Sequence, residues 1–280
     1  MSGTLYLVAT PIGNLEDITL RAIRILREVD LIAAEDTRHT AKLLRYHEID
    51  TKTTSLHEHN EREKSPVLVA KLRNGESIAL LSDAGTPVIS DPGLVLVRQA
   101  LDAGVQVVPL PGPSSVIAAL VASGAPPSSF TFLGFPPSRS NDRKSWFSNL
   151  ASEPRTLIFF ESPHRMRTTL QLCLETWGDR QLSICREMTK LHEELVIRPI
   201  SEHLKAMLTP RGEYTCVVWP SQGADRPDIP LPKRAVLLAE FGQITETSKS
   251  RKAAVKEMAL RYGLTARELY LQLEAAKNSG

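Results

Sequence analysis

The sequence has few cysteines, no long hydrophobic run and no low-complexity tract. Its three cysteines, Cys173, Cys185 and Cys216, are widely spaced and odd in number, so they suggest neither a disulfide framework nor a zinc site. The longest apolar stretch, residues 116–122, is too short to cross a bilayer. The first residues lack the basic segment of a signal peptide. These absences predict a globular cytoplasmic protein with reduced cysteines.

Strong charge of either sign is also missing, because the net charge is +2 with 24% charged residues. The 280 residues are enough for two domains with a large buried core. Basic residues outnumber acidic ones in residues 223–280. This imbalance permits contact with nucleic acid but does not demonstrate it.

The chain also lacks a standard nucleotide fingerprint after its first predicted strand, residues 5–8. The turn that follows, ATPIGN, is neither a GxGxxG motif nor a P-loop. This disfavours an NAD-dependent oxidoreductase and an NTP-binding enzyme. Asp17 is the predicted N-cap of the helix that follows. Three arginines on one face of that helix, Arg21, Arg24 and Arg27, indicate a solvated basic face, with RNA contact as the alternative.

Residues 78–93, IALLSDAGTPVISDPG, combine a buried strand with a ligand-type turn. The apolar run 78–81 suits a strand that is covered on both faces. Small residues and Gly85 follow, which allow the backbone to approach a ligand closely. Ligands bind beyond the carboxyl ends of strands in open α/β sheets. Ser90, Asp91 and Pro92 predict the start of the next helix.

Polar residues follow two more predicted strands. Strand 31–34 ends in Glu35, Asp36 and Arg38, which suit either a surface ion pair or a substrate and general-base site. Strand 105–108 leads into PLPGPSS, where Ser114 and Ser115 either cap a helix or face a shared pocket. The pair His57 and His59 lacks a third metal ligand at convincing spacing, so no metal site is predicted.

The rest of the chain continues the α/β pattern and ends in helices. Residues 124–129 are the predicted linker to a second α/β block, and the proline-rich residues 223–232 are a second linker. The predicted domains are therefore residues 1–124, 125–222 and 223–280. Helix 249–262 and a capping box at 265–268 suggest a helix-turn-helix-like unit or a helical hairpin that packs on a partner.

Eight ordered motifs resemble the ribosomal-RNA branch of the tetrapyrrole methylase family. The strongest is SDAGTPVISDPG (82–93). The others are ATPIGNLEDITLRA (9–22), AAEDTRHT (33–40), HEHNE (57–61), PLPGPSS (109–115), FFESPHR (159–165), REMTKLHEE (186–194) and RGEYT (211–215). The resemblance covers residues 5–220, and the tail resembles the helical extension of the same branch. It implies two α/β domains with a cofactor cleft between them, and a homodimer.

The resemblance also implies that S-adenosylmethionine is the cofactor and that the reaction is 2′-O-methylation of a cytidine in 16S rRNA of the small ribosomal subunit, in the decoding region. The motifs carry over these cofactor-binding residues: Ile12, Asp83, Gly85, Thr86, Ile89, Ser114, Ser115, Phe160 and Met188. Where other branches of the family have Gly-Asp-Pro, this chain has Gly85-Thr86-Pro87. The resemblance assigns the displaced carboxylate to Asp83.

A ribose hydroxyl is a weak nucleophile, so a general base assists its methylation. We hypothesise that Glu35 or Asp36 is this base and that Arg38 positions a phosphate or ribose. His59, Glu61, His164, Arg165, Lys190 and Glu193 are further candidate substrate contacts, or else ordinary ion-paired residues. The alternatives are a methyltransferase of a tetrapyrrole intermediate and a non-catalytic RNA-binding assembly factor.

Overall fold

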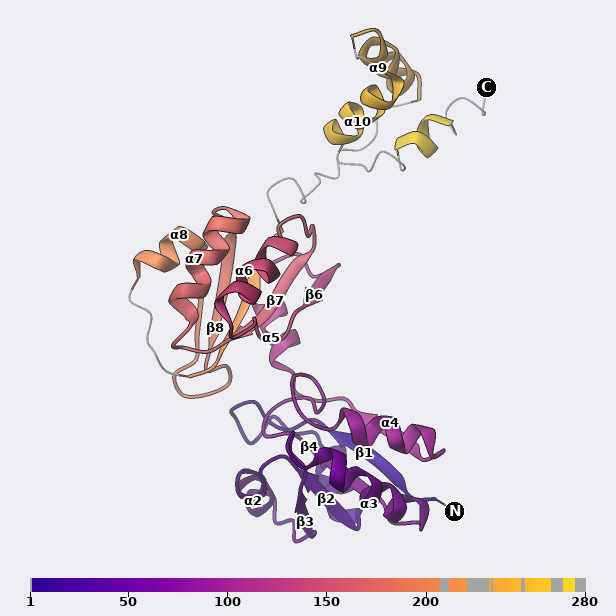
Figure 1. The fold of residues 1–280 in the computed structure, drawn as a ribbon, viewed down its shortest axis with the longest axis vertical. Coiled ribbons are helices and arrows are strands. Elements are labelled where there is room, and N and C mark those ends of the chain that lie inside the picture. The colour runs from indigo at the N-terminus through magenta and orange to yellow at the C-terminus, as the bar shows by residue number, and fades with distance from the viewer. Residues whose placement is uncertain are drawn as a thin grey trace. The chain divides into compact units, whose positions relative to one another are not determined.

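The structure is a computed structural model of the 280-residue chain, and it describes residues 2–206, 212–220, 232, 234–247, 250–262 and 269–274. The chain divides into two compact units. The first unit comprises Met1–Ser152 and Thr156–Trp219, and the second comprises Glu153–Arg155 and Pro220–Gly280 (Figure 1). Among the helices that the structure describes, none has the length and apolar composition needed to span a membrane.

The first sheet of the larger unit is parallel, with strand order β3-β2-β4-β1-β5. Its strands are β1 (Thr4–Val8), β2 (Leu31–Ala34), β3 (Thr53–Ser55), β4 (Ile78–Leu81) and β5 (Gln106–Leu110). The connecting helices are α1 (Leu20–Glu28), α2 (Thr37–Tyr46), α3 (Glu61–Arg73) and α4 (Leu94–Asp102). Leu81 is level with both Val8 and Ala34 in the register, so β1, β2 and β4 end at one edge.

Helices cover both faces of this sheet, as the apolar run at 78–81 predicted. Ala79 and Leu81 pack into one hydrophobic cluster, which includes residues of α1 and α2. Ile78 and Leu80 point the other way, into a cluster with residues of α3 and α4. Alternate side chains of a strand lie on opposite faces of its sheet. All four residues of β4 are buried, which makes this strand the centre of the fold.

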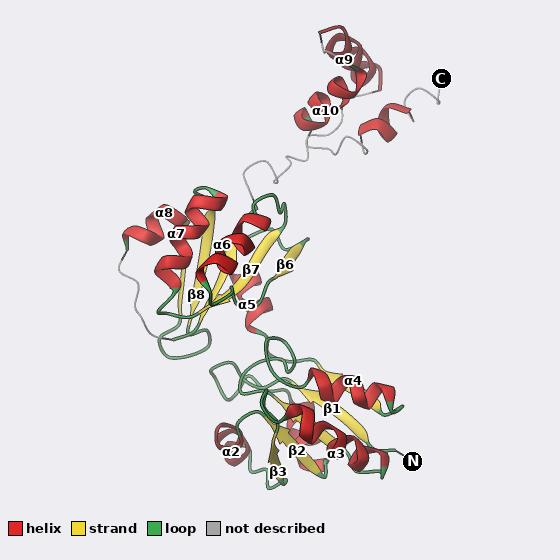
Figure 2. Ribbon diagram, viewed as in Figure 1, coloured by secondary structure: helices red, strands yellow, loops and turns green. Residues whose placement is uncertain are grey.

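The second sheet is mixed, with strand order β6-β7-β10-β8-β9. Its strands are β6 (Phe130–Phe132), β7 (Thr156–Glu161), β8 (Gln181–Arg186), β9 (Glu194–Pro199) and β10 (Tyr214–Val218). Helices α6 (Ser140–Asn149), α7 (Met166–Trp177) and α8 (Ile200–Lys205) accompany it (Figure 2). Phe147, Phe159 and Trp177 form the centre of its main core. Helix α5 (Ser115–Ala122) packs against other residues of this sheet, including Ile158 and Val217.

The smaller unit has a hydrophobic core of its own. It contains α9 (Arg234–Thr247) and α10 (Arg251–Arg261). Phe241 of α9 and Met258 of α10 pack together with Leu269 and Leu273 from the described segment 269–274. The helix expected at 249–262 corresponds to α10, whereas α9 was not predicted. The capping box expected at 265–268 lies outside the described residues.

These features confirm the predicted fold class, but two helix starts differ from the prediction. Thr19, not Asp17, caps α1, because its hydroxyl accepts a hydrogen bond from the backbone N–H of Ala22 at 3.1 Å. Helix α4 begins at Leu94 with Gly93 as its N-cap, so the cap predicted at residues 90–92 is wrong. The difference arises because the cap comes from a distant side chain, Glu61, described below.

Candidate functional site

The turns after β1 and β4 are joined directly at the sheet edge. The backbone N–H of Thr10 donates to the carbonyl of Gly85 at 2.8 Å, and the N–H of Gly85 donates to the carbonyl of Thr10 at 2.9 Å. The hydroxyl of Thr10 donates a further hydrogen bond to the carbonyl of Ser82 at 3.1 Å. The first turn and the 82–93 loop therefore form one continuous surface.

The 82–93 loop has a strained backbone. Val88 and Ser90 have φ values of 74° and 65°, in the left-handed region that non-glycine residues rarely occupy. Gly85 has a φ of 80°, and a Cβ there would lie 3.4 Å from Cγ2 of Ile12. Strained backbone of this kind concentrates at ligand sites, where the surrounding structure holds it in place.

Glu61 fixes the far end of this loop. Its Oε1 atom accepts hydrogen bonds from the backbone N–H groups of Gly93 at 2.8 Å and Val95 at 2.7 Å. The residue is only 8% exposed. These N–H groups begin helix α4 and have no partner within the helix. Glu61, a candidate substrate contact by sequence, is therefore engaged in holding the loop.

Reciprocal hydrogen bonds link the residues after β2 to those after β4. The backbone N–H of Asp83 donates to Oε2 of Glu35 at 3.2 Å. The backbone N–H of Asp36 donates to Oδ1 of Asp83 at 3.1 Å. These two bonds tie the ends of β2 and β4 together at one edge of the sheet.

Asp36 and Arg38 face away from the site that Glu35 joins. The Asp36 carboxylate accepts from the backbone N–H of Arg38 at 2.8 Å as the N-cap of α2, and it pairs with the Arg38 guanidinium at 2.7 Å. The hydrogen bond with that guanidinium holds the pKa of Asp36 well below its usual range. The Arg38 side chain is 89% exposed. A carboxylate with so low a pKa is a poor proton acceptor.

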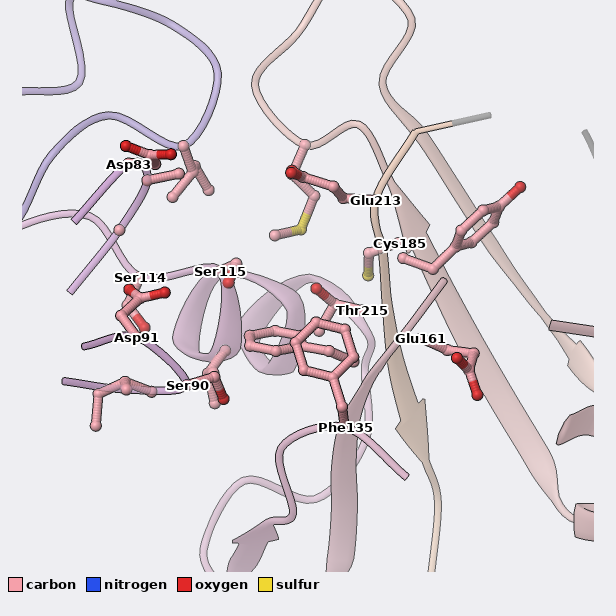
Figure 3. A pocket seen from close by; sticks show the side chains of 18 of the residues that line it. Asp83, Ser90, Asp91, Ser114, Ser115, Phe135, Glu161, Cys185, Glu213 and Thr215 are labelled. Atoms are coloured by element: carbon pink, nitrogen blue, oxygen red, sulfur yellow. The ribbon is translucent and has the colours of Figure 1, made fainter. Parts of the chain in front are cut away.

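One pocket of about 360 Å³ collects the turns of the first sheet and residues that follow strands of the second. Figure 3 shows Asp83, Asp91 and Ser114 on one side and Cys185 and Glu213 on the other. All nine residues expected to bind the cofactor line it: Ile12, Asp83, Gly85, Thr86, Ile89, Ser114, Ser115, Phe160 and Met188. Of the three predicted catalytic residues, Glu35 lines the pocket and Asp36 and Arg38 do not.

Three carboxylates of the pocket differ from the others in their ionic contacts. Glu35, Asp83 and Asp91 line it, and none of them forms an ion pair within the part of the chain that the structure describes. The other pocket carboxylates have ionic partners: Glu161 pairs with Arg165 at 2.7 Å, and Glu187 and Glu213 share Lys190. The pocket is thus negative near the 82–93 loop and suits a ligand with positive charge.

Asp91 is the site residue that sequence reasoning missed, because Ser-Asp-Pro indicated a helix start. Burial, and next the charge of Glu35, raise the pKa of Asp91 to about 7. Burial likewise raises the pKa of Glu35, with a smaller contribution from the charge of Asp83. The signal in the sequence was the placement of Asp91 on the same loop as Asp83 and Gly85.

Aromatic residues near the second sheet and the start of helix α5 complete the pocket. Phe160 packs edge-on against Phe132 at 5.0 Å between ring centroids and lies 5.3 Å from Phe135. Ser114 occupies the N-cap position of α5, but its side chain makes no capping hydrogen bond. Its hydroxyl is therefore not committed to the helix.

Burial raises the pKa of the Cys185 thiol to about 12, which makes it a poor nucleophile at neutral pH.

Two more of the predicted substrate contacts form ion pairs within the protein. Arg165 pairs with Glu161, and Lys190 pairs with Glu187 and Glu213, as noted above. On α1, Arg24 pairs with Glu28, and Arg27 donates to the carbonyl of His47 at 2.7 Å. Among the described residues, no group of three or more His, Cys, Asp or Glu side chains is arranged to hold a metal ion.

The sequence of the chain is similar to those of methyltransferases. Residues 4–203 match the family model described as Tetrapyrrole (Corrin/Porphyrin) Methylases. The chain is 47% identical over 264 residues to a protein of Vibrio cholerae serotype O1 named ribosomal RNA small subunit methyltransferase I, covering 87% of this chain and 92% of the relative. A protein of the same name from Mesorhizobium japonicum is 42% identical over 280 residues, covering 99% and 95%.

A solved structure shows the same fold at low sequence identity. A crystal structure of diphthine synthase superposes with a TM-score of 0.61 at 14% identity and covers 78% of this chain and 90% of the other. Likeness at this identity concerns the fold alone.

Proposed function

The chain belongs to the family of tetrapyrrole (corrin/porphyrin) methylases, and on this premise we propose that it methylates the 2′-hydroxyl of a cytidine in 16S rRNA of the small ribosomal subunit. It is an S-adenosylmethionine-dependent methyltransferase. Relatives named as small-subunit rRNA methyltransferases, at 42–47% identity over most of the chain, support the RNA as substrate. The choice of a cytidine ribose, in the decoding region, comes from the motif resemblance.

The observation that carries the proposal is the pocket, whose chemistry fits the cofactor. S-Adenosylmethionine carries a positive sulfonium and an ammonium group, and Glu35, Asp83 and Asp91 supply unpaired negative charge. Gly85, Ile12 and Phe160 provide backbone and apolar surface against which a nucleoside can lie. The uncommitted hydroxyl of Ser114, at the start of α5, suits the polar end of the amino-acid moiety. When bound, the cofactor supplies an activated methyl group.

The residues of the chain bind the cofactor and the RNA, orient them for transfer, and accept the proton of the ribose hydroxyl. Methyl transfer needs the nucleophile, methyl group and sulfur in line, so positioning is the main contribution of the protein. Glu35, Asp36 and Arg38 remain the proposed catalytic group, and their placement separates their roles. Glu35 belongs with the pocket carboxylates, to which we assign the acid–base work. Asp36 orients the exposed Arg38, which is free to meet a phosphate of the RNA.

The organisation of the chain is also part of the proposal. We propose domain boundaries near residues 124 and 222, with the linker and helical tail after them. The tail, whose helices α9 and α10 share a core, contributes to RNA binding. A homodimer and a cytoplasmic location remain predictions of the resemblance.

The proposal is tested by measuring cofactor binding and methyl transfer together. A ligand that binds only the folded state raises its melting temperature. We expect S-adenosylmethionine to stabilise the protein and its labelled methyl group to reach small-subunit RNA but no tetrapyrrole. Binding to the RNA without stabilisation by the cofactor would instead identify a non-catalytic assembly factor. Transfer to a tetrapyrrole would identify the other branch of the family.

A further inference from the structure

The pocket contains two neighbouring carboxylates, Glu35 and Asp91, that come from different strand ends. Glu35 follows β2, and Asp91 belongs to the loop after β4. Both line the pocket together with Asp83. Glu35 is committed to the backbone N–H of Asp83 through its Oε2 atom. Among the described residues, the hydrogen-bonding group that acts on the Asp91 carboxylate is the hydroxyl of Ser82, not a backbone N–H group.

The backbone on both sides of Asp91 has positive φ values and is anchored to the core of the protein. Ser90, directly before it, has a φ of 65°, and Gly93, two residues later, has a φ of 122°. A Cβ at Gly93 would lie 2.6 Å from Cδ2 of Leu80, so the backbone there is pressed against the core. Glu61 anchors the same segment through the N–H groups of Gly93 and Val95. Asp91 is therefore presented to the pocket by a segment that cannot relax into an ordinary helix start.

We propose that Asp91 is the catalytic residue that accepts the proton of the attacking ribose hydroxyl, and that Glu35 is a positioning residue that acts through Asp91. This inference rests on the proposed function. As the oxygen–methyl bond forms, the methyl–sulfur bond breaks and its electron pair stays on sulfur. The hydroxyl proton passes to the Asp91 carboxylate, so atoms and charge balance without another reactant.

The electrostatics of the pocket support this assignment. Burial raises the pKa of Asp91 most, the negative charges of Glu35 and Asp83 raise it further, and a hydrogen bond with the Ser82 hydroxyl lowers it. Glu35 in turn faces Asp36, Asp83 and His39. The resulting pKa of Asp91, about 7, is that of an efficient proton acceptor at neutral pH. The pKa of Asp36, in contrast, lies well below its usual range.

Cofactor binding gives a readout that does not depend on activity. The cationic cofactor favours the ionised form of Asp91, so binding near pH 7 releases a proton. Calorimetric titration in buffers of different ionisation enthalpy measures this release. We expect release on binding S-adenosylmethionine, less on binding S-adenosylhomocysteine, which lacks the sulfonium charge, and a loss of the difference in Asp91→Asn. Equal proton release by wild type and Asp91→Asn would overturn the proposal.

Single-turnover transfer to small-subunit RNA completes the test. Asp91→Asn lowers the rate at saturating cofactor by about 100-fold or more, a larger effect than the weakening of cofactor binding that follows from the loss of its negative charge. In Glu35→Gln, the increase of the transfer rate with pH occurs at lower pH, because removing the charge of Glu35 makes Asp91 easier to ionise. Asp102→Asn, at the exposed end of α4, is the matched control and behaves as wild type.

Two results would contradict the assignment. One is a near-wild-type rate in Asp91→Asn, and the other is a large loss of cofactor affinity with an unchanged rate at saturation. If Asp91→Asn fails to fold, an unshifted pH profile in Glu35→Gln contradicts it equally. A wild-type protein that methylates no small-subunit RNA would refute the proposed function itself. An active wild type with an equally active Asp91→Asn variant would refute only this inference.

Discussion

Glu35 accepts a hydrogen bond from the backbone N–H of Asp83 at 3.2 Å, across 48 residues of sequence. Asp83 completes the link by accepting from the N–H of Asp36 at 3.1 Å. The two strand ends therefore hold one another, and the carboxylates at the edge of the sheet lie in a fixed arrangement. This link holds Glu35 beside the loop that carries Asp91 and lines the cofactor pocket.

Substitutions of Glu35, Asp36 and Arg38, which follow β2, should affect different steps of the reaction. We expect Glu35→Gln to lower the plateau rate of methyl transfer, reached at high pH, by about tenfold, because a fall in the pKa of Asp91 makes it a weaker base; this loss is smaller than that of removing the base itself. Arg38→Ala should mainly weaken RNA binding, because the side chain is exposed and outside the pocket. Asp36→Asn keeps a capping oxygen but loses the ion pair with Arg38, so its effect should resemble that of Arg38→Ala. Near-wild-type kinetics in all three variants would refute a role for this motif.

Gly85 should be required for cofactor binding more than for stability. Gly85→Ala places a side chain at a φ of 80° and at 3.4 Å from Ile12 in the pocket. The backbone cost is about 1–2 kcal/mol, and the new methyl group narrows the pocket. Gly104→Ala is a matched control, with a φ of 70° and no atom within 4 Å of the new Cβ. The melting temperature should fall by a similar amount in both variants. Calorimetry should show weaker cofactor binding only in Gly85→Ala.

Glu61 should stabilise both the fold and the cofactor loop. Glu61→Ala leaves the N–H groups of Gly93 and Val95 without their acceptor, at a cost of about 1–3 kcal/mol each when they stay buried. Denaturation in urea measures this loss, and Glu63→Ala, at an exposed position in the same first turn of α3, is the control. Equal stability of the two variants would show that the capping contact contributes nothing measurable.

The helical tail should contribute to RNA binding and not to cofactor binding. The truncated chain ending at Pro232 keeps both sheets and every residue of the pocket. We expect binding to small-subunit RNA to weaken by about tenfold or more, with a smaller dependence on salt, because basic residues are lost. Cofactor affinity serves as the internal control. Unchanged RNA affinity would assign the tail to another partner.

The centre of the fold was predictable because its signals are local. Residues 78–81 and 31–34 are short apolar runs followed by small or charged residues, and both became buried strands with polar ends. Strand β9 was missed because it lies at the edge of its sheet, where Leu195 and Ile197 are 42% and 45% exposed and give no sign of burial. Helix α9 was missed because it follows a proline-rich segment that suggested only a linker.

The candidate site was predictable as a set of turns but not as a set of contacts. The motifs placed nine residues around one pocket, since the carboxyl ends of neighbouring parallel strands meet at one edge. The capping of α4 by Glu61, 32 residues away from Gly93, depends on tertiary packing and leaves no local signal. Asp91 was assigned to a helix start for the same reason.

The central claim is tested most directly by mapping ribose methylation on 16S rRNA. Small subunits that lack the modification are incubated with the wild-type protein and labelled S-adenosylmethionine, and each methylated nucleotide is identified with its position on base or ribose. The account predicts label at the 2′-oxygen of a cytidine, lost in Asp91→Asn and retained in Asp102→Asn. Label on a base, or no label in 16S rRNA, would contradict it.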